Sequence, residues 1–321
     1  MVYRGDTIHT FIIFLMFGAG LALIIWGGDR FVDAAVWIAE VSGLPRFLIG
    51  ATVVSVATTL PEIIVSVMAA ADGQPQMAAG NAVGSVTANT ALILSLTVIF
   101  MPFAVRRRDY AENTAIFLSA VTLLLVLCLR GRLTVFGSAA MMMLFIFYMY
   151  RSIRAAKRLS GSAPTSSAAG SGRQLIRFIT GAAAIILGSR LLVDYGTLIA
   201  REVFHVDERV ISLTLVAVGT SLPELVTAVT SVIKRRSSLA AGNILGANII
   251  DILLILPLCT FVSGGSMPLE PEVARLDLPV CLLCAVILFV PALIRRRFYR
   301  WQGFAALSVY GLYLWRLICT A

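Results

Sequence analysis

Charge is scarce in this sequence, because only 13% of its 321 residues are Asp, Glu, Lys or Arg, whereas 59% are hydrophobic. The mean hydropathy is +0.92. A soluble chain of this length would form two or three domains with far more surface charge. Apolar runs of about 20 residues cross the hydrocarbon core of a bilayer, and such runs take up most of the chain. The composition indicates a membrane protein with little room for a soluble domain.

Lysine is rarer still and occurs only as Lys157 and Lys234. Neither follows a glycine or an aspartate, which excludes a Walker A loop and an Asp-Lys phosphorylation motif. We therefore expect neither ATP nor any other cofactor. The excess of 26 basic over 17 acidic residues is better explained by loop orientation than by a nucleic-acid partner.

Cysteine and histidine offer no metal-binding or redox framework. All five cysteines lie within apolar runs, where a thiol behaves as a small hydrophobe. His9 and His205 lie near the ends of apolar runs, which excludes a buried histidine relay.

Hydropathy predicts an all-α membrane protein with ten spans. They lie near residues 9–28, 45–70, 77–100, 113–130, 133–151, 176–199, 209–233, 239–262, 276–294 and 302–319. Four basic clusters hold 16 of the 26 Lys and Arg residues, and all four fall on one side of this arrangement. The positive-inside rule then places both termini outside. Residues 154–173 are predicted to be a flexible cytoplasmic linker between five-helix halves at 1–153 and 174–321.

An internal repeat relates the two halves. A shift of 162 positions aligns residues 50–89, the first repeat segment, with residues 212–251, the second repeat segment, and 13 of the 40 pairs are identical. Five spans, an odd number, separate each segment from its copy, so the halves must cross the membrane in opposite directions. Such inverted repeats are typical of secondary transporters, whose binding sites lie near the midplane.

Only three carboxylates fall deep inside the predicted spans, namely Glu62, Glu224 and Asp251. A charged side chain at the centre of a membrane helix costs about 2.5–3.5 kcal/mol on the insertion scale. Glu62 and Glu224 occupy matching positions and each follows a proline, Pro61 or Pro223. Because proline cannot donate to the carbonyl four residues earlier, it opens the helix and frees backbone oxygens. This pattern predicts a cation site.

The polar residues near these acids offer oxygen ligands, with no imidazole and no thiolate among them. Hard oxygen ligands suit Ca²⁺, Mg²⁺ and Na⁺. Two carboxylates balance one divalent ion or two monovalent ions. A flexible, largely dehydrated cage favours calcium over magnesium, because magnesium sheds its water reluctantly.

Two motifs of the second repeat segment, residues 219–224 (GTSLPE) and 242–251 (GNILGANIID), resemble an alpha-repeat of the sodium/calcium exchanger family, within the cation/calcium antiporters. The first repeat segment carries similar motifs at 57–62 (ATTLPE) and 80–85 (GNAVGS). The resemblance implies ten helices in two inverted halves. It also implies an antiporter, not an enzyme, that exchanges Ca²⁺ for Na⁺ as a multi-pass protein of a prokaryotic plasma membrane.

The resemblance further implies which residues hold the ions. Calcium would be bound by Glu62 and Glu224 with backbone oxygens of Thr58 and Thr220. Sodium would be bound by the same glutamates with Ser55, Thr59, Ser85, Ala217 and Ser221, of which Ser55 and Ala217 would act through backbone carbonyls. Asn89 and Asp251 would occupy central positions beside the glutamates.

Three departures from the family pattern leave the coupling ion open. Ala247 stands where the family commonly has serine, Val86 where it has asparagine, and Ala57 where it has glycine. The loss of a hydroxyl at Ala247 favours fewer or weaker sodium sites, so coupling to protons is one alternative. An acid at the position of Asp251 accompanies potassium co-transport in parts of the family. A passive cation channel and an intramembrane aspartyl protease are the alternatives from other classes.

Overall fold

The computed structural model describes residues 3–159, 171–204, 219 and 221–320, and most of them are helical. Before residue 160 the elements are α1 (Tyr3–Ser42), α2 (Arg46–Ile49), η1 (Gly50–Val54), α3 (Ser55–Thr58), α4 (Leu60–Ala71), α5 (Pro75–Ala88), η2 (Asn89–Leu94), α6 (Ser95–Phe100), α7 (Arg107–Cys128), β1 (Arg132–Thr134) and α8 (Val135–Leu159). After residue 170 they are α9 (Ser171–Leu198), η3 (Ile199–Val203), α12 (Leu222–Ile233), α13 (Ser237–Ile250), η5 (Asp251–Ile255), α14 (Leu256–Val262), β2 (Ser266–Pro268), η6 (Val273–Asp277), α15 (Leu278–Arg295) and α16 (Arg300–Thr320). The elements labelled η are short π-helical segments.

Seven of the described helical stretches are long and apolar enough to cross a membrane. They are His9–Ser42, Pro75–Phe100, Tyr110–Cys128, Val135–Ala156, Ser171–Val203, Ser237–Val262 and Val273–Arg295. Two further pieces, Arg46–Thr58 and Leu60–Ala71, make an eighth span bent by 46°. All eight overlap predicted spans. Two predicted spans remain, 209–233 and 302–319. Helix α12 covers the described end of the first, and α16 covers the second but is not among the seven helical stretches that are long and apolar enough to cross a membrane. The number ten therefore stays a prediction.

Three helix boundaries differ from the predicted ones. The first helix, α1, has 40 residues and continues far beyond the predicted end of its span at residue 28. It ends only where Gly43 adopts a positive φ of 67° and Pro45 follows, because no proline interrupts the chain before that point. Helices α8 and α9 extend into the predicted linker at 154–173, to Leu159 and from Ser171.

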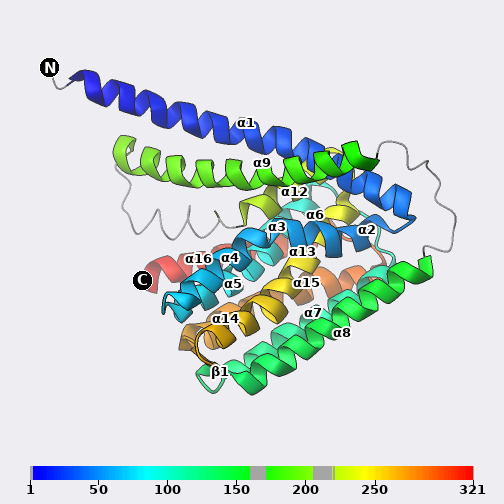
Figure 1. The fold of residues 1–321 in the computed structure, drawn as a ribbon. Helices are drawn as coiled ribbons and strands as arrows, with labels where there is room; N and C mark the ends of the chain where they lie inside the picture. The colour runs from blue at the N-terminus through cyan, green and yellow to red at the C-terminus, as the bar shows by residue number, and fades with distance from the viewer. Residues whose placement is uncertain (1–2, 160–170, 205–218, 220, 321) are drawn as a thin grey trace.

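Helices α1 and α9 form a tight pair along one edge of the molecule (Figure 1). Gly27 faces Gly181, and a Cβ built on Gly27 would lie 2.8 Å from the Gly181 carbonyl oxygen. Gly20 faces Gly188, and a Cβ on Gly188 would lie 2.7 Å from the Gly20 carbonyl oxygen. The residue number rises from 20 to 27 along α1 while that of the facing residue falls from 188 to 181 along α9, so the two helices are antiparallel.

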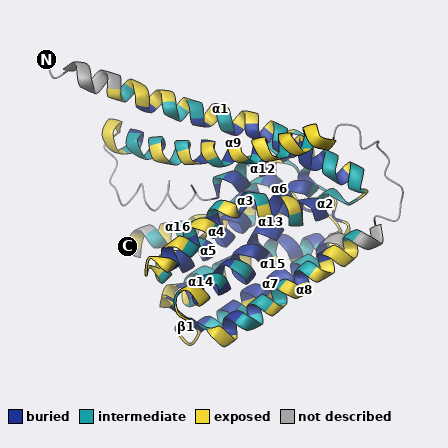
Figure 2. Ribbon diagram, in the orientation of Figure 1, coloured by how far each residue is buried: buried dark blue, intermediate teal, exposed yellow. Residues whose placement is uncertain are grey.

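The most buried helix is α13, in which every residue from Leu239 to Ile250 is buried. Figure 2 shows buried residues in the centre of the molecule and exposed ones along α1, α9 and α8. Gly242 and Gly246 let α13 approach the backbone of α2 and η1. A Cβ on Gly242 would lie 2.2 Å from the Phe47 carbonyl oxygen, and one on Gly246 would lie 2.5 Å from that of Ala51.

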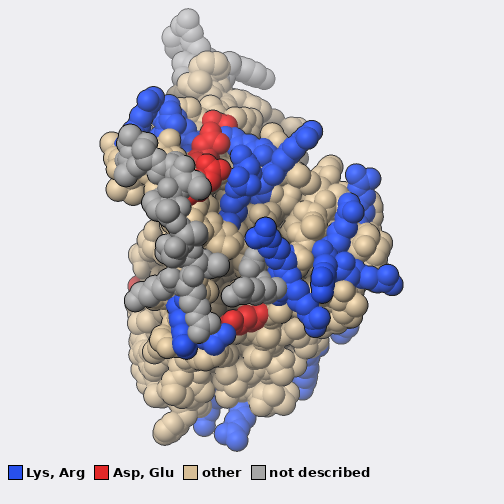
Figure 3. Space-filling model, turned by 90° about the vertical axis from the view of Figure 1, so that its right-hand side faces the viewer, with Lys and Arg blue, Asp and Glu red and all other residues tan. Residues whose placement is uncertain are grey.

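A short antiparallel ladder joins the two halves of the chain, with Leu133 of β1 paired to Met267 of β2. At the other end of the molecule, many Lys and Arg side chains gather on one face (Figure 3). Two of the predicted basic clusters are neighbours, because the amide of Val105, next to Arg106, donates to the Arg296 carbonyl at 2.8 Å. The placement of all four clusters on one side of the membrane stays a prediction.

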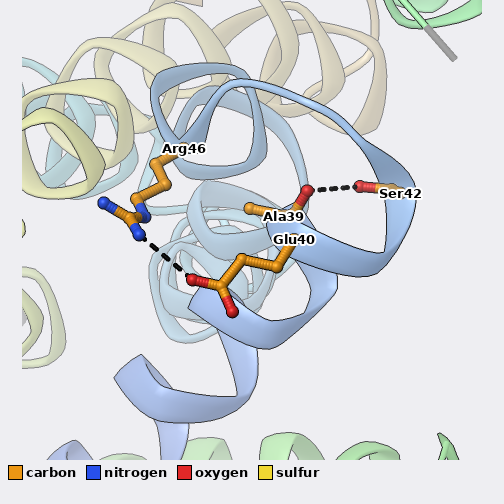
Figure 4. Close-up of polar contacts among 4 residues, drawn as sticks. All are labelled: Ala39, Glu40, Ser42 and Arg46. Carbon is orange, nitrogen blue, oxygen red and sulfur yellow. Dashed lines mark hydrogen bonds and ion pairs between the residues drawn. The ribbon is translucent and has the colours of Figure 1, made fainter. Parts of the chain in front are cut away.

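The corner that connects α1 to α2 is stabilised by local polar contacts (Figure 4). The Ser42 hydroxyl donates to the Ala39 carbonyl at 3.3 Å. The guanidinium of Arg46 pairs with the Glu40 carboxylate at 3.1 Å across the turn. These contacts all lie within residues 39–46, so the corner is stabilised locally, shortly before the first repeat segment begins at residue 50.

Candidate ion-binding site

A helix with a proline in its first turn begins at matching positions of the two repeat segments. Helix α3 ends at Thr58, and α4 begins at Leu60 with Pro61 in its first turn. In the copy, α12 begins at Leu222 with Pro223 in its first turn. Because proline has no amide hydrogen, Pro61 cannot donate to the backbone carbonyl four residues earlier. The interruption between α3 and α4 lies inside the protein, because Thr58 and Thr59 are buried.

Glu62 and Glu224 lie in the first turns of α4 and α12. Each is 1% exposed. Helix N-termini carry partial positive charge from unpaired amides, which stabilises a carboxylate placed there. The two acids of the repeat therefore occupy the same structural position, one on α4 and one on α12.

Direct hydrogen bonds join the two repeat segments around these acids. The Thr59 hydroxyl donates to the Glu224 carboxylate at 3.3 Å, and the Thr58 hydroxyl donates to the Asn243 side-chain oxygen at 3.2 Å. All of these side chains are buried. Residues separated by more than 160 positions in the chain thus form one polar cluster.

Asn89 and Asp251 mark a second correspondence between the segments. Asn89 begins the π-helical segment η2, and Asp251 begins the π-helical segment η5. Their exposed fractions are 1% and 0%. Single π-helical turns occur frequently at functional sites, because they shift the helix register and redirect side chains.

Many oxygens in this cluster have no hydrogen-bond partner. These buried atoms are both carboxylate oxygens of Glu62 and of Asp251, Oε2 of Glu224, Oδ1 of Asn89, and the hydroxyls of Ser85 and Ser221. A buried oxygen without a partner costs free energy. The carboxylate of Glu62 is also repelled by those of Glu224 and Asp251. A cation would relieve both costs.

Acidic groups alone do not complete a coordination shell. Among the described residues, no group of three or more His, Cys, Asp and Glu side chains is arranged to hold a metal ion. Hydroxyl, amide and backbone oxygens would have to supply the remaining ligands, which is the chemistry that Ca²⁺ and Na⁺ accept.

Most of the predicted site residues are buried in the structure. Buried positions are found for Ser55, Thr58, Thr59, Glu62, Ser85, Asn89, Ser221, Glu224 and Asp251. Ala217 and Thr220 lie outside the described residues.

The sequence analysis missed one buried polar pair near the site. The Asn248 amide donates to the Thr90 hydroxyl at 2.8 Å, and both residues are completely buried. Each adjoins a predicted central residue, because Thr90 follows Asn89 and Asn248 precedes Asp251 by three positions. The available signal was a second amide, besides Asn243, within a largely apolar helix.

The sequence matches the family described as "Sodium/calcium exchanger protein" over residues 12–154 and 173–319. The inner membrane protein YrbG of Escherichia coli is 32% identical, over 92% of this chain and 93% of YrbG. The sodium/calcium exchanger MaX1 of Methanosarcina acetivorans is 28% identical, over 94% of this chain and 97% of MaX1.

Solved structures show a similar fold. The sodium-calcium exchanger NCX_Mj, soaked with Na⁺ and Sr²⁺, superposes with a TM-score of 0.83 at 28% identity. The match covers 94% of this chain and 98% of that one.

Proposed function

Because the chain belongs to the sodium/calcium exchanger protein family, a family of membrane transporters and not of enzymes, we propose that it is a secondary antiporter that exchanges Ca²⁺ for Na⁺. The observation that carries this proposal is the pairing of Glu62 and Glu224. Both acids are buried at matching positions of the two repeat segments, and each has at least one carboxylate oxygen without a hydrogen-bond partner.

Competition for these carboxylates couples the two ions. One Ca²⁺, or two Na⁺, balances the charge of the glutamate pair, whereas two uncompensated carboxylates in a buried site are strongly unfavourable. The filled cluster can therefore change its access from one side of the membrane to the other, and the empty cluster cannot do so readily. An ion drives this change only through a difference in its affinity for the two states.

The two ions share the glutamates in this scheme and differ in their other ligands. Calcium is held by Glu62 and Glu224 with backbone oxygens of Thr58 and Thr220. Sodium uses the same carboxylates with oxygens of Ser55, Thr59, Ser85, Ala217 and Ser221. Asn89 and Asp251 flank the glutamates as central polar groups. The chain acts in a prokaryotic plasma membrane with its basic face in the cytoplasm and both termini outside.

The test is calcium uptake into proteoliposomes that contain the purified chain. Sodium, potassium and proton gradients are imposed separately, and calcium flux is followed with a tracer. We expect uptake driven by an outward sodium gradient. Calcium entry down its own gradient, with no counter-ion, would instead indicate a passive channel.

Exchange of calcium for protons is the second candidate. Ala247 is completely buried beside the cluster and supplies no hydroxyl, and both oxygens of Asp251 lack a partner. A site with fewer sodium ligands and an additional acid favours a proton as the counter-ion. Uptake driven by a pH gradient in the absence of sodium would identify this alternative.

A further inference from the structure

The internal repeat extends to the helix pair α1 and α9. A shift of 161 positions aligns residues 20–33 of α1 with 181–194 of α9, and seven of the fourteen pairs are identical. The identical positions in α1 are Gly20, Ala22, Ile24, Ile25, Gly27, Val32 and Asp33. This register matches the packing, because Gly20 and Gly27 contact the equivalents of Gly27 and Gly20 on α9. The pair therefore has approximate two-fold symmetry.

One end of α12 is held to α1 by Lys234. Its ammonium lies 2.6 Å from the Asp29 carboxylate, 2.7 Å from the Asp33 carboxylate and 2.9 Å from the Asp29 carbonyl oxygen. An ammonium has three hydrogens, so all three are used. We call this set the Lys234 contact. Partial burial disfavours the charge, but the two ion pairs outweigh it and raise the pKa of Lys234 above its ordinary value, so the contact persists at neutral pH.

The repeat assigns an equivalent to each partner in this contact. A shift of 162 relates Lys234 to Asp72, at the end of α4, and the shift of 161 relates Asp29 to Arg190 and Asp33 to Asp194 on α9. The charges of Lys234 and Asp29 are reversed in their equivalents, so Asp72 and Arg190 again make a complementary pair, whereas Asp194 keeps the negative charge of Asp33. In the described part of the chain, neither Asp72 nor Arg190 forms an ion pair, and both are exposed.

Helix packing shows the same difference between the two sides. A Cβ on Gly28 of α1 would lie 2.7 Å from the Thr230 hydroxyl and 3.7 Å from its Cβ, so α1 lies directly against α12. The equivalents of these two residues are Ser189 on α9 and Met68 on α4. Within the described residues α4 has no comparable packing against α9, and the exposed fraction of Met68 is 59%. Among the residues that the structure describes, α1 covers one side of the cluster, and α9 does not cover the equivalent side in the same way.

We propose that two ion-pair contacts alternate during transport, with Lys234 bound to Asp29 and Asp33 when one side of the ion site is closed, and Asp72 bound to Arg190 when the opposite side is closed. This inference rests on the proposed antiport function. It identifies Lys234, Asp29, Asp33, Asp72 and Arg190 as positioning residues, because none of them touches the ion cluster. The Lys234 contact uses two carboxylates, whereas Asp72 has a single basic partner on α9. The arrangement described here is therefore the favoured one at rest.

Disulfide formation between α4 and α9 tests the alternation. The variant carries Met68→Cys and Ser189→Cys, with Cys319→Ser because the other four native cysteines are buried. On the Lys234 side the equivalent residues are Gly28 and Thr230. A Cβ built on Gly28 would lie 3.7 Å from the Cβ of Thr230, which is within the range found in disulfides. The engineered bond should therefore form only when the Asp72 side closes. Its rate of formation is measured in membranes under mild oxidation.

Adding Lys234→Gln should raise this rate by roughly tenfold, because the favoured arrangement loses its ion pairs. Arg235→Gln removes the same charge from the adjacent exposed residue, which has no ion pair among the described residues, and should leave the rate unchanged. Lys234→Arg should keep the parent rate. Asp72→Asn should lower the rate.

A second variant tests the proposal if Lys234→Gln does not fold. If Lys234→Gln is not recovered as a monodisperse protein, Asp29→Asn with Asp33→Asn removes the same ion pairs from α1 and should raise the rate equally. Unchanged disulfide formation in these variants, or no disulfide in any of them, would overturn the alternation. The readout does not depend on which ion is transported, so a failed flux assay and a failed disulfide assay are separate results.

Discussion

The hydroxyl of Thr59, in the first repeat segment, donates a hydrogen bond of 3.3 Å to the carboxylate of Glu224, in the second. The two residues are 165 positions apart in the chain. The first segment thus contributes to the polar surroundings of the second segment's acid. Neither half alone can form the proposed site, which explains why a duplicated element was needed to build it.

We expect Glu62→Gln and Glu224→Gln each to abolish sodium-driven calcium uptake. Glutamine has nearly the same shape as glutamate, but it removes one of the two negative charges that balance a divalent ion. Uptake in proteoliposomes is the measurement, and elution by size exclusion establishes that the variants are folded.

Glu272→Gln is the matched control for these substitutions. Glu272 is exposed and lies outside the buried cluster, so its neutralisation should leave uptake at the parent level. Normal uptake by either Glu62→Gln or Glu224→Gln would contradict the proposed function.

Thr59→Val should weaken ion binding without unfolding the chain. Valine keeps the volume of threonine but cannot donate to Glu224, and a hydrogen bond to a charged group contributes about 1.5–3 kcal/mol. The half-saturating concentrations of both ions should rise by roughly tenfold or more. Thr59→Ser retains the hydroxyl and should bind both ions nearly as well as the parent; equal affinities in the valine variant would remove Thr59 from the site.

The positions of the helices were largely predictable from the sequence, but two of their features were not. Hydropathy located the apolar runs because lipid requires them. It did not reveal that α1 continues to Ser42 through Asp29 and Asp33, since these carboxylates are held by Lys234 from a distant part of the chain. It also gave no sign of the π-helical turns at Asn89 and Asp251, because such turns depend on tertiary packing.

The repeat predicted the site better than it predicted the surroundings of the site. Glu62, Glu224 and their prolines were identified because the same rare residues occur twice in apolar spans. The hydrogen bond between Asn248 and Thr90 has no such signature in the sequence, because the residue equivalent to Asn248 in the first repeat segment is Val86, which has no polar side chain. Contacts that break the symmetry can be found only from coordinates.

Ala247→Ser should strengthen the dependence on sodium. The family resemblance predicts a hydroxyl at this position, and Ala247 is completely buried in α13, next to Gly246. Serine adds one oxygen ligand with little added volume. The half-saturating sodium concentration should fall, and any proton-driven uptake should fall relative to sodium-driven uptake. Ala240→Ser adds the same hydroxyl at another completely buried position of α13, and an equal response there would show that the effect is not specific to the site.

Gly242→Ala should destabilise the folded protein. The added Cβ would lie 2.2 Å from the Phe47 carbonyl oxygen, and backbone cannot move aside as a flexible side chain can. Overpacking of this kind typically costs about 1–3 kcal/mol, occasionally more, so the thermal unfolding midpoint in detergent should fall. Gly311→Ala is the control, because nothing lies within 4 Å of the added carbon and alanine favours the helical conformation by up to about 1 kcal/mol. If both variants unfold at the parent temperature, α13 does not pack on α2 as closely as described, and the geometry of the cluster that depends on this contact would have to be revised.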